Sequence, residues 1–318
     1  MAKFKDSLTG LTPIGAIYGV WFLVCFAILQ LPLPIIRGGT ILSNLYHHVI
    51  LPLSTVFFIL LASLSTALFM VYVEPSLKRN RVLRHFTVLF TVALGVGLFM
   101  FVRHTGNTGA VLFIIASANL IVFANLIGTL IVTPLERPAE LILLCVVMSL
   151  VDFFSVFAGP TKWIAESVKQ YYESGMKGEV PIGDFLLVKI AVPGLGQLVP
   201  VFGIADWIIV SFFSAAVVKF GMKDNLFGQG LEVMVKNRRL SMYFPMASLG
   251  LVVAVLSAQA LGLFLPALPV IAFVFLAYLL VRYPDARKLT KKDWILIFSF
   301  AGGMGLLAIF FRVVRSLL

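Results

Sequence analysis

Two acidic residues lie deep inside long apolar stretches of this sequence. Asp152 falls within the apolar run 139–158, and Asp206 falls within the run 198–220. The other 12 of the 14 acidic residues lie in loops or near the ends of apolar runs. A carboxylate in the middle of a membrane costs at least about 2.5 kcal/mol, so a functional role is the first hypothesis for such a residue. We therefore take Asp152 and Asp206 as the candidate reactive groups.

The spacing of the two aspartates predicts that they meet. Asp152 lies shortly before the long loop 159–197, and Asp206 lies shortly after it. Antiparallel neighbouring helices would hold both residues at the same depth. Two carboxylates in a low dielectric cannot both ionise, because repulsion and desolvation make them share one proton. One of them can then activate a water while the other donates a proton to a peptide carbonyl.

Two other uses of the same residues stay open at this point. Each aspartate can pair with a backbone or serine group, or the two can carry a proton or cation across the membrane. Transporters usually have paired halves with interrupted helices, and the sequence contains no internal repeat.

Three short segments surround these aspartates and follow them along the chain. The first, 151–162, reads VDFFSVFAGPTK and contains Asp152. The second, 202–211, reads FGIADWIIVS and places Gly203 and Ala205 just before Asp206. The third, 265–269, reads LPALP and begins an apolar run with the residues Pro266, Ala267 and Leu268.

In this order the three segments resemble the two aspartate motifs and the Pro-Ala-Leu motif of the presenilin and signal-peptide-peptidase family. The resemblance covers roughly residues 140–281. It implies a presenilin-like helix bundle, a catalytic pair formed by Asp152 and Asp206, and an active site shaped by Gly203, Ala205 and the Pro-Ala-Leu segment. Val151 stands where the family has a tyrosine, and Ala205 stands where it has the second glycine of Gly-x-Gly-Asp.

The resemblance further implies an aspartic endopeptidase that cuts the transmembrane helices of membrane proteins or signal peptides. No metal and no organic cofactor is expected. An inactive relative that binds membrane helices without cutting them is an alternative, as is the proton- or cation-coupled transporter. The apolar, β-branched segment 185–192 lies between Gly183 and Pro193 and predicts a strand. Such a strand would offer an edge to an unwound substrate.

The composition places the whole chain in a membrane. Of its 318 residues, 60% are hydrophobic and 12% are charged, whereas soluble domains are typically about half apolar and about a quarter charged. A helix needs about 20 apolar residues to cross a bilayer. We expect an all-α polytopic membrane protein with about nine spans, in the runs 13–35, 49–73, 86–102, 110–132, 139–158, 198–220, 242–262, 264–281 and 294–311.

These runs divide the chain into three regions. Residues 1–138 form a four-span N-terminal region, 139–283 the catalytic region, and 284–318 an additional C-terminal span. The longest loop, 159–197, begins with apolar residues at helical spacing and predicts an interfacial helix over 160–176. In the fourth run, Asn119 and Asn125 predict hydrogen bonds between helices.

The loop charges predict the orientation. About two thirds of the 25 basic residues fall on the side of the N-terminus when the loops are assigned alternately to the two sides. The positive-inside rule then places the N-terminus in the cytoplasm and the loop 159–197 outside, in a multi-pass protein of the cell membrane. The net charge of +11 is not arranged as a basic stripe with interleaved aromatic residues, so no nucleic-acid partner is expected. The lipid bilayer and transmembrane helical substrates are the expected partners.

Overall fold

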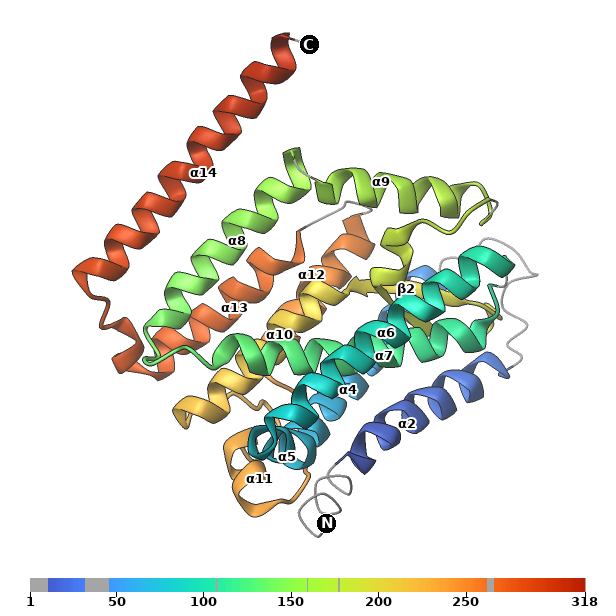
Figure 1. Ribbon diagram of the computed structural model, residues 1–318, viewed down its shortest axis with the longest axis horizontal. Coiled ribbons are helices and arrows are strands. Elements are labelled where there is room, and N and C mark those ends of the chain that lie inside the picture. The colour runs from blue at the N-terminus through green and yellow to red at the C-terminus, as the bar shows by residue number, and fades with distance from the viewer. Residues whose placement is uncertain are drawn as a thin grey trace.

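The computed structural model describes residues 11–31, 46–106, 108–158, 160–176, 178–261 and 266–317. The chain is mostly helical, and most of its helices run along one common direction (Figure 1). The N-terminal half supplies α2 (Thr12–Leu29), η2 (Tyr46–Ile50), α4 (Leu51–Leu68), η3 (Phe69–Val73), α5 (Glu74–Arg79), α6 (Arg81–Thr105) and α7 (Ala110–Val132). The C-terminal half supplies α8 (Glu140–Ala158), α9 (Pro160–Glu173), η4 (Ile182–Leu186), β1 (Leu187–Ala191), β2 (Leu198–Gly203), α10 (Ile204–Phe220), α11 (Leu231–Asn237), α12 (Met246–Leu261), α13 (Ala267–Arg282), η5 (Pro284–Arg287) and α14 (Lys291–Leu317).

Four helical stretches among the described residues are long and apolar enough to cross a membrane. They are Thr12–Leu29, Tyr46–Arg79, Arg81–Thr105 and Ala110–Val132. The second of these, at 34 residues, joins η2, α4, η3 and α5 into one rod. The helices α12 and α13 are apolar but shorter, at 16 residues each. These lengths and compositions define a helical membrane protein.

The sixth apolar run is not one helix, and that expectation was wrong. Residues Leu198–Gly203 form β2, and only Ile204–Phe220 form the helix α10. Pro200 explains the difference, because proline inside a helix removes a backbone hydrogen bond and clashes with the preceding turn. The β-branched neighbours Val199 and Val201 favour an extended chain. The predicted strand in 185–192 is confirmed as β1, and β2 pairs with it in antiparallel register.

The strand β1 lies in the interior of the bundle. Its residues Val188, Lys189, Ile190 and Ala191 are buried against α7, α2 and α4. The N–H of Lys189 donates to Ser117 Oγ on α7 at 3.0 Å, so the side of β1 that does not pair with β2 faces a helix. The accessible edge of the hairpin therefore belongs to β2, and not to the predicted strand.

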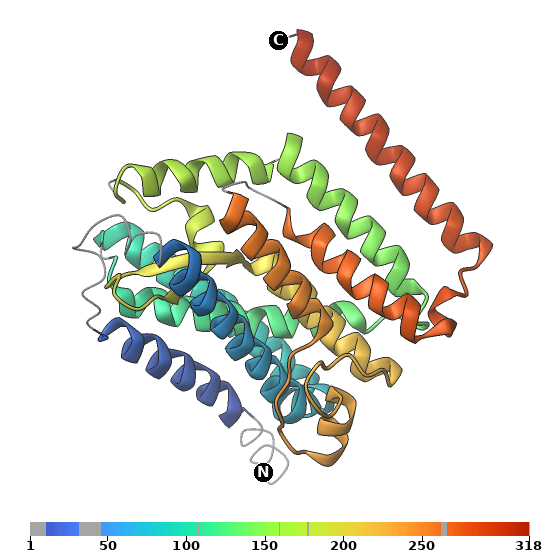
Figure 2. The same ribbon diagram turned by 180° about the vertical axis from the view of Figure 1, so that it is seen from behind.

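The loop between α9 and β1 is fixed by a buried charged group. Lys189 forms an ion pair with Asp184, and both side chains are buried. Tyr172 of α9 donates to the same carboxylate at 2.8 Å, while the Lys189 ammonium lies 3.3 Å from the centre of the Phe113 ring. These contacts join α9, η4, β1 and α7. The predicted helix in 160–176 is confirmed as α9, which lies across one end of the bundle (Figures 1 and 2).

The helices α7 and α10 form the central contact of the bundle, and both asparagines of α7 bind neighbouring helices. Asn125 accepts hydrogen bonds from Thr66 of α4 and Ser211 of α10, at 2.8 and 2.6 Å. Asn119 accepts one from Tyr18 of α2 at 2.7 Å and donates to a backbone carbonyl of α6 at 2.9 Å. The predicted hydrogen bonds between helices are confirmed.

Gly128 allows α7 to approach α10 closely. A Cβ atom at this position would lie 2.7 Å from the backbone nitrogen of Phe212, a distance that the packed backbones cannot tolerate. Gly250 plays the same part between α12 and α13, where a Cβ would lie 2.7 Å from the Cα of Ile271. Small residues at such positions let membrane helices pack backbone to backbone.

This packing gives a direct test. We expect Gly128→Ala to lower the melting temperature of the detergent-solubilised protein, because overpacking costs about 1–3 kcal/mol. Gly97→Ala is the matched control, since Gly97 lies in α6 with nothing within 4 Å of the added carbon. The control should be neutral or slightly stabilising, because alanine favours helix. Equal melting temperatures for the wild type and Gly128→Ala would contradict the close contact.

Candidate functional site

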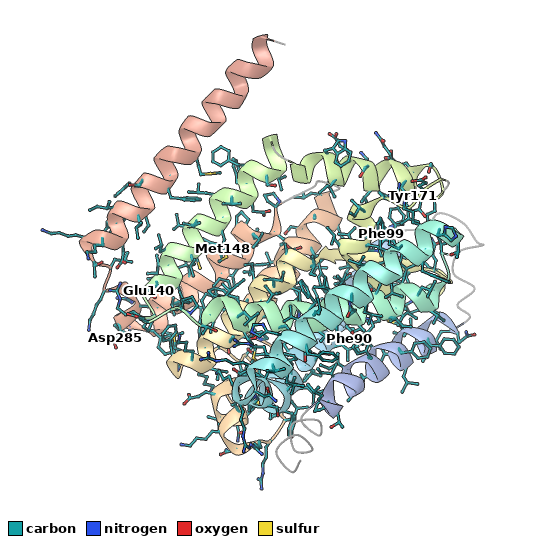
Figure 3. The ribbon with its side chains drawn as sticks, in the orientation of Figure 1. Phe90, Phe99, Glu140, Met148, Tyr171 and Asp285 are labelled. Carbon is teal, nitrogen blue, oxygen red and sulfur yellow. The ribbon has the colours of Figure 1, made fainter. Side chains whose placement is uncertain are left out.

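Three helices of the C-terminal half carry the residues that the sequence singles out. Asp152 lies on α8, Asp206 on α10, and Ala267 and Leu268 begin α13. The helices α8 and α13 pack against each other. Figure 3 labels Glu140, where α8 begins, and Asp285, just after α13 ends, and both lie at the same end of the bundle. The two helices are therefore antiparallel, which brings the last turns of α8 beside the first turn of α13.

Asp206 lies in the first turn of α10, directly after the strand β2. Its Oδ2 atom accepts a hydrogen bond from the N–H of Gly203 at 2.9 Å. The first N–H groups of a helix lack partners within the helix, and they give its N-terminus a partial positive charge. The strand-to-helix transition thus places a carboxylate where backbone donors meet it.

The two small residues before Asp206 have different surroundings. A Cβ at Gly203 would lie 3.3 Å from Asp206 Oδ2, tighter than ordinary packing, so a side chain there would press on the carboxylate. The side chain of Ala205 is exposed. Its methyl group therefore fits in place of the family's second glycine without a clash against the protein.

Asp152 lies in the last two turns of α8. Its carboxyl group is near the backbone N–H of Leu268, one of the donors that have no partner within the helix at the start of α13. Its Oδ2 atom has no hydrogen-bond partner in the described part of the chain. The side chain is half-buried, and its neighbours Val151 and Phe153 are exposed. Val151, the position at which the sequence departs from the first aspartate motif, is thus at the surface.

The Pro-Ala-Leu segment presents its backbone to Asp152. Pro266 occupies the N-cap position of α13 in an extended conformation, and the helix begins at Ala267. Proline is well suited to a helix start because the missing N–H has no helical partner there anyway. The N–H of Leu268 stays free to reach the carboxyl group of Asp152.

Asp152 also belongs to the surroundings of Asp206, because the charge of the Asp152 carboxyl group acts on Asp206. Asp206 thus lies beside Gly203 in the first turn of α10, and Asp152 lies on α8, which packs against α13. Both side chains are half-buried. The contact between the two carboxyl groups stays a prediction.

Other candidate sites do not compete with this one. An apolar cavity of about 720 Å³ lies between α2, α6 and α7, lined by residues such as Ile14, Phe22 and Phe90; Phe90 is labelled in Figure 3. It contains none of the site residues. Within the described ranges, no three His, Cys, Asp or Glu side chains come together as metal ligands.

Another buried carboxyl group, which the sequence does not indicate, belongs to Asp224 in the loop after α10. Asp224 is 1% exposed and accepts a hydrogen bond from Tyr243 at 3.2 Å. The hydroxyl oxygen of Tyr243 also lies 3.0 Å from Ser214 Oγ on α10. Asp224 belongs to a polar-looking loop, so only the fold reveals its burial. Burial raises the pKa of Asp224 to about 7, and the hydrogen bond from Tyr243 partly opposes the rise.

No family model, no curated protein and no solved structure matches the chain. The fold defines a helical membrane protein with two half-buried aspartates on separate helices. The resemblance to the presenilin and signal-peptide-peptidase family rests on the three sequence segments alone.

Asp224 predicts a pH dependence of stability. Its pKa in the folded protein lies above the unfolded value, so the folded state keeps a proton that the unfolded state has lost between about pH 4 and pH 7. The contribution of this group to the free energy of unfolding therefore falls as the pH rises through that window, and it changes no further above it. Asp224→Asn should remove this part of the slope when melting temperatures are measured from pH 4 to 8. A variant with the slope of the wild type would show that Asp224 does not titrate in this range.

Proposed function

We propose that this protein is an intramembrane aspartyl protease that hydrolyses peptide bonds in transmembrane helices, with Asp152 and Asp206 as its catalytic pair. The observation that carries the proposal is the placement of two half-buried carboxyl groups on separate helices, with the charge of Asp152 acting on Asp206 and Asp152 near the start of the Pro-Ala-Leu helix. Gly203, Ala205 and the segment from Pro266 to Leu268 shape the site around them.

The chemistry needs one ionised and one protonated carboxyl group. The carboxylate removes a proton from a water molecule, and the water oxygen forms a bond to the peptide carbonyl carbon. The protonated partner gives its proton to the carbonyl oxygen, which yields a tetrahedral diol. The C–N bond then breaks as a diol hydroxyl gives its proton to the carboxylate that donated one in the first step and the carbonyl re-forms. The leaving nitrogen takes a proton from the carboxyl group that first received one, so both aspartates return to their starting states. The half-burial of both aspartates is compatible with entry of the water.

The hairpin supports a route for the substrate. A transmembrane helix must unwind before its backbone can be attacked, and its freed N–H and C=O groups then need partners within the membrane. The edge of β2 can provide them by strand addition. The strand β2 continues directly into the first turn of α10, so a strand paired there would lie next to Asp206.

We further propose that the protein has nine spans in a presenilin-like bundle, with a cytoplasmic N-terminus in the cell membrane. Helices occupy each of the nine apolar runs, although β2 takes the first part of the sixth. The helix α9 and the basic segment around α11 lie at opposite ends of the bundle (Figures 1 and 2). The excess of positive charge around α11 favours the cytoplasm for that end.

Cleavage of a helical peptide is the decisive test. We expect the purified protein in liposomes to cut a single-span peptide that carries helix-weakening residues. Asp152→Asn and Asp206→Asn should each abolish cleavage, because the pair needs one base and one acid. The double variant should be no worse than either single variant, since the two groups act as a unit. Product masses measured over time give the readout.

Two further variants separate the site from general damage. Gly203→Ala should lower the turnover, because the added carbon presses on Asp206 Oδ2. Ala205→Gly is the matched control, and it should leave cleavage unchanged or increase it because the Ala205 side chain is exposed.

A wild type that cuts no peptide in a varied panel, yet carries protons in an aspartate-dependent way, would instead identify a transporter. Binding of helices without either activity would identify an inactive relative, and Val151→Tyr with Ala205→Gly would then be the variant to examine.

Labelling of single cysteines tests the orientation. Lys169 of α9 has a 74% exposed side chain, and Lys236 of α11 is exposed at the other end. A membrane-impermeant maleimide should label Lys169→Cys in intact cells but label Lys236→Cys only after permeabilisation. Background labelling should be low, because the native residues Cys25 and Cys145 are buried. The opposite pattern would reverse the orientation.

A further inference from the structure

Six basic residues gather at the end of the bundle that carries α5 and α11. We call this set the basic patch: Arg79, Arg81, Arg84, Lys236, Arg238 and Arg239. Its two halves come from distant parts of the chain and are held together by contact between η3 and α11. The hydroxyl of Tyr72 in η3 donates to the backbone carbonyl of Arg238 at 3.1 Å. The patch is thus a fixed surface of the fold.

The basic patch lacks acidic partners. Glu74 is bound to Lys78 at 2.5 Å, and Glu232 lies beside Gly221. Within the described residues, no acidic side chain forms an ion pair with a member of the basic patch. The positive charges are therefore available to an external anion.

Two arginines stand where the local structure disfavours a positive charge. Arg81 and Arg84 lie in the first turn of α6, which contains no acidic residue. A helix N-terminus carries a partial positive charge of its own, so cations there are destabilising and anions are stabilising. The Nε atom of Arg84 is also buried without a hydrogen-bond partner among the described residues. An anion at this turn would relieve the electrostatic cost of the two arginines.

Arg238 is strained for a different reason. It ends α11 with a φ of 50°, in the left-handed region that usually takes glycine at a helix C-terminus. A non-glycine residue in this conformation costs free energy, and such strain is often found at functional positions. The side chain is exposed, so among the described residues it is not packed in a way that would offset the backbone strain.

The neighbouring surface indicates which anion fits. Directly after Arg81, the helix α6 exposes a row of large apolar side chains: Val82, Phe86, Leu89 and Phe90, which are 78%, 63%, 68% and 53% exposed. The basic patch therefore borders a surface for hydrocarbon. A soluble phosphate would use the arginines alone, whereas a phospholipid would use the arginines for its headgroup and α6 for its acyl chains.

We propose that the basic patch binds the headgroups of anionic phospholipids, with the acyl chains lying along α6. Arginine is suited to this role because its planar guanidinium group binds phosphate oxygens through two parallel hydrogen bonds. Bound lipid would tie the α5–α6 turn to α11 through the phosphate. This inference concerns a surface remote from the aspartates and does not depend on the proposed protease activity.

Lipid-dependent thermal shifts of the full-length protein in neutral detergent test the proposal. Phosphatidylglycerol should raise the melting temperature of the wild type, while phosphatidylcholine should not. The triple variant Arg79→Gln, Arg81→Gln, Arg84→Gln should lose most of this shift. Arg238→Gly should lose part of it, although its melting temperature without lipid should equal or exceed that of the wild type because the backbone strain is relieved. Arg238→Gly therefore keeps the test valid even if the triple variant folds poorly.

Arg103→Gln is the matched control at the other end of α6, where Arg103 pairs with Glu179 at 3.2 Å. It should keep the full shift. The proposal is overturned if Arg238→Gly and the triple variant both keep the shift of the wild type, or if Arg103→Gln loses as much as they do. An equal shift with inorganic phosphate would overturn the lipid as the ligand and assign the patch to soluble anions. Native mass spectrometry gives an independent measurement for each variant, the number of phosphatidylglycerol molecules that stay bound to the protein.

Discussion

A carboxylate removed from water is stable only where other donors replace the water, and this constraint organises the C-terminal half of the protein. Backbone N–H groups at the starts of helices are the donors used here. Asp206 accepts a hydrogen bond from the N–H of Gly203 as the chain enters α10, and Asp152 lies near the N–H of Leu268 as the chain enters α13. The helix α10 therefore begins at the end of the hairpin, and α13 begins beside α8.

The interruption of the sixth apolar run follows from the same constraint. A continuous helix through 198–220 would have satisfied all its N–H groups internally and left none for Asp206. The strand β2 avoids this, but its own backbone then needs partners. The strand β1 supplies them on one side, and β1 is in turn held by Ser117 and by the Asp184–Lys189 ion pair. The hairpin, the buried charges and the helix start form one connected structure.

The sequence predicted the parts of this structure that depend on composition and local pattern. The apolar runs, the strand at β1, the helix α9 and the hydrogen-bonding role of Asn119 and Asn125 were all visible. Loop position and helix direction also predict that Asp152 and Asp206 lie at equal depth and close together, and this stays a prediction. The sequence did not reveal β2, since a run of Leu, Val and Phe has the same hydropathy in a strand as in a helix; Pro200 was the available signal. Nor did it reveal Asp224, because the burial of a loop residue depends on long-range packing.

The proline in β2 has a consequence for association between copies of the protein. The N–H of Lys189 points away from β2 and donates to Ser117. Lys189 and its partner Pro200 therefore form a pair without mutual hydrogen bonds. In such a pair the backbone nitrogen of Pro200 points to the outer edge of β2. That nitrogen carries no hydrogen. A free strand edge in a bilayer invites a second edge to join it, because no water competes for the backbone groups. Because this donor is missing, any strand added at the edge of β2, whether from a substrate or from a second copy, forms one hydrogen bond fewer beside Pro200.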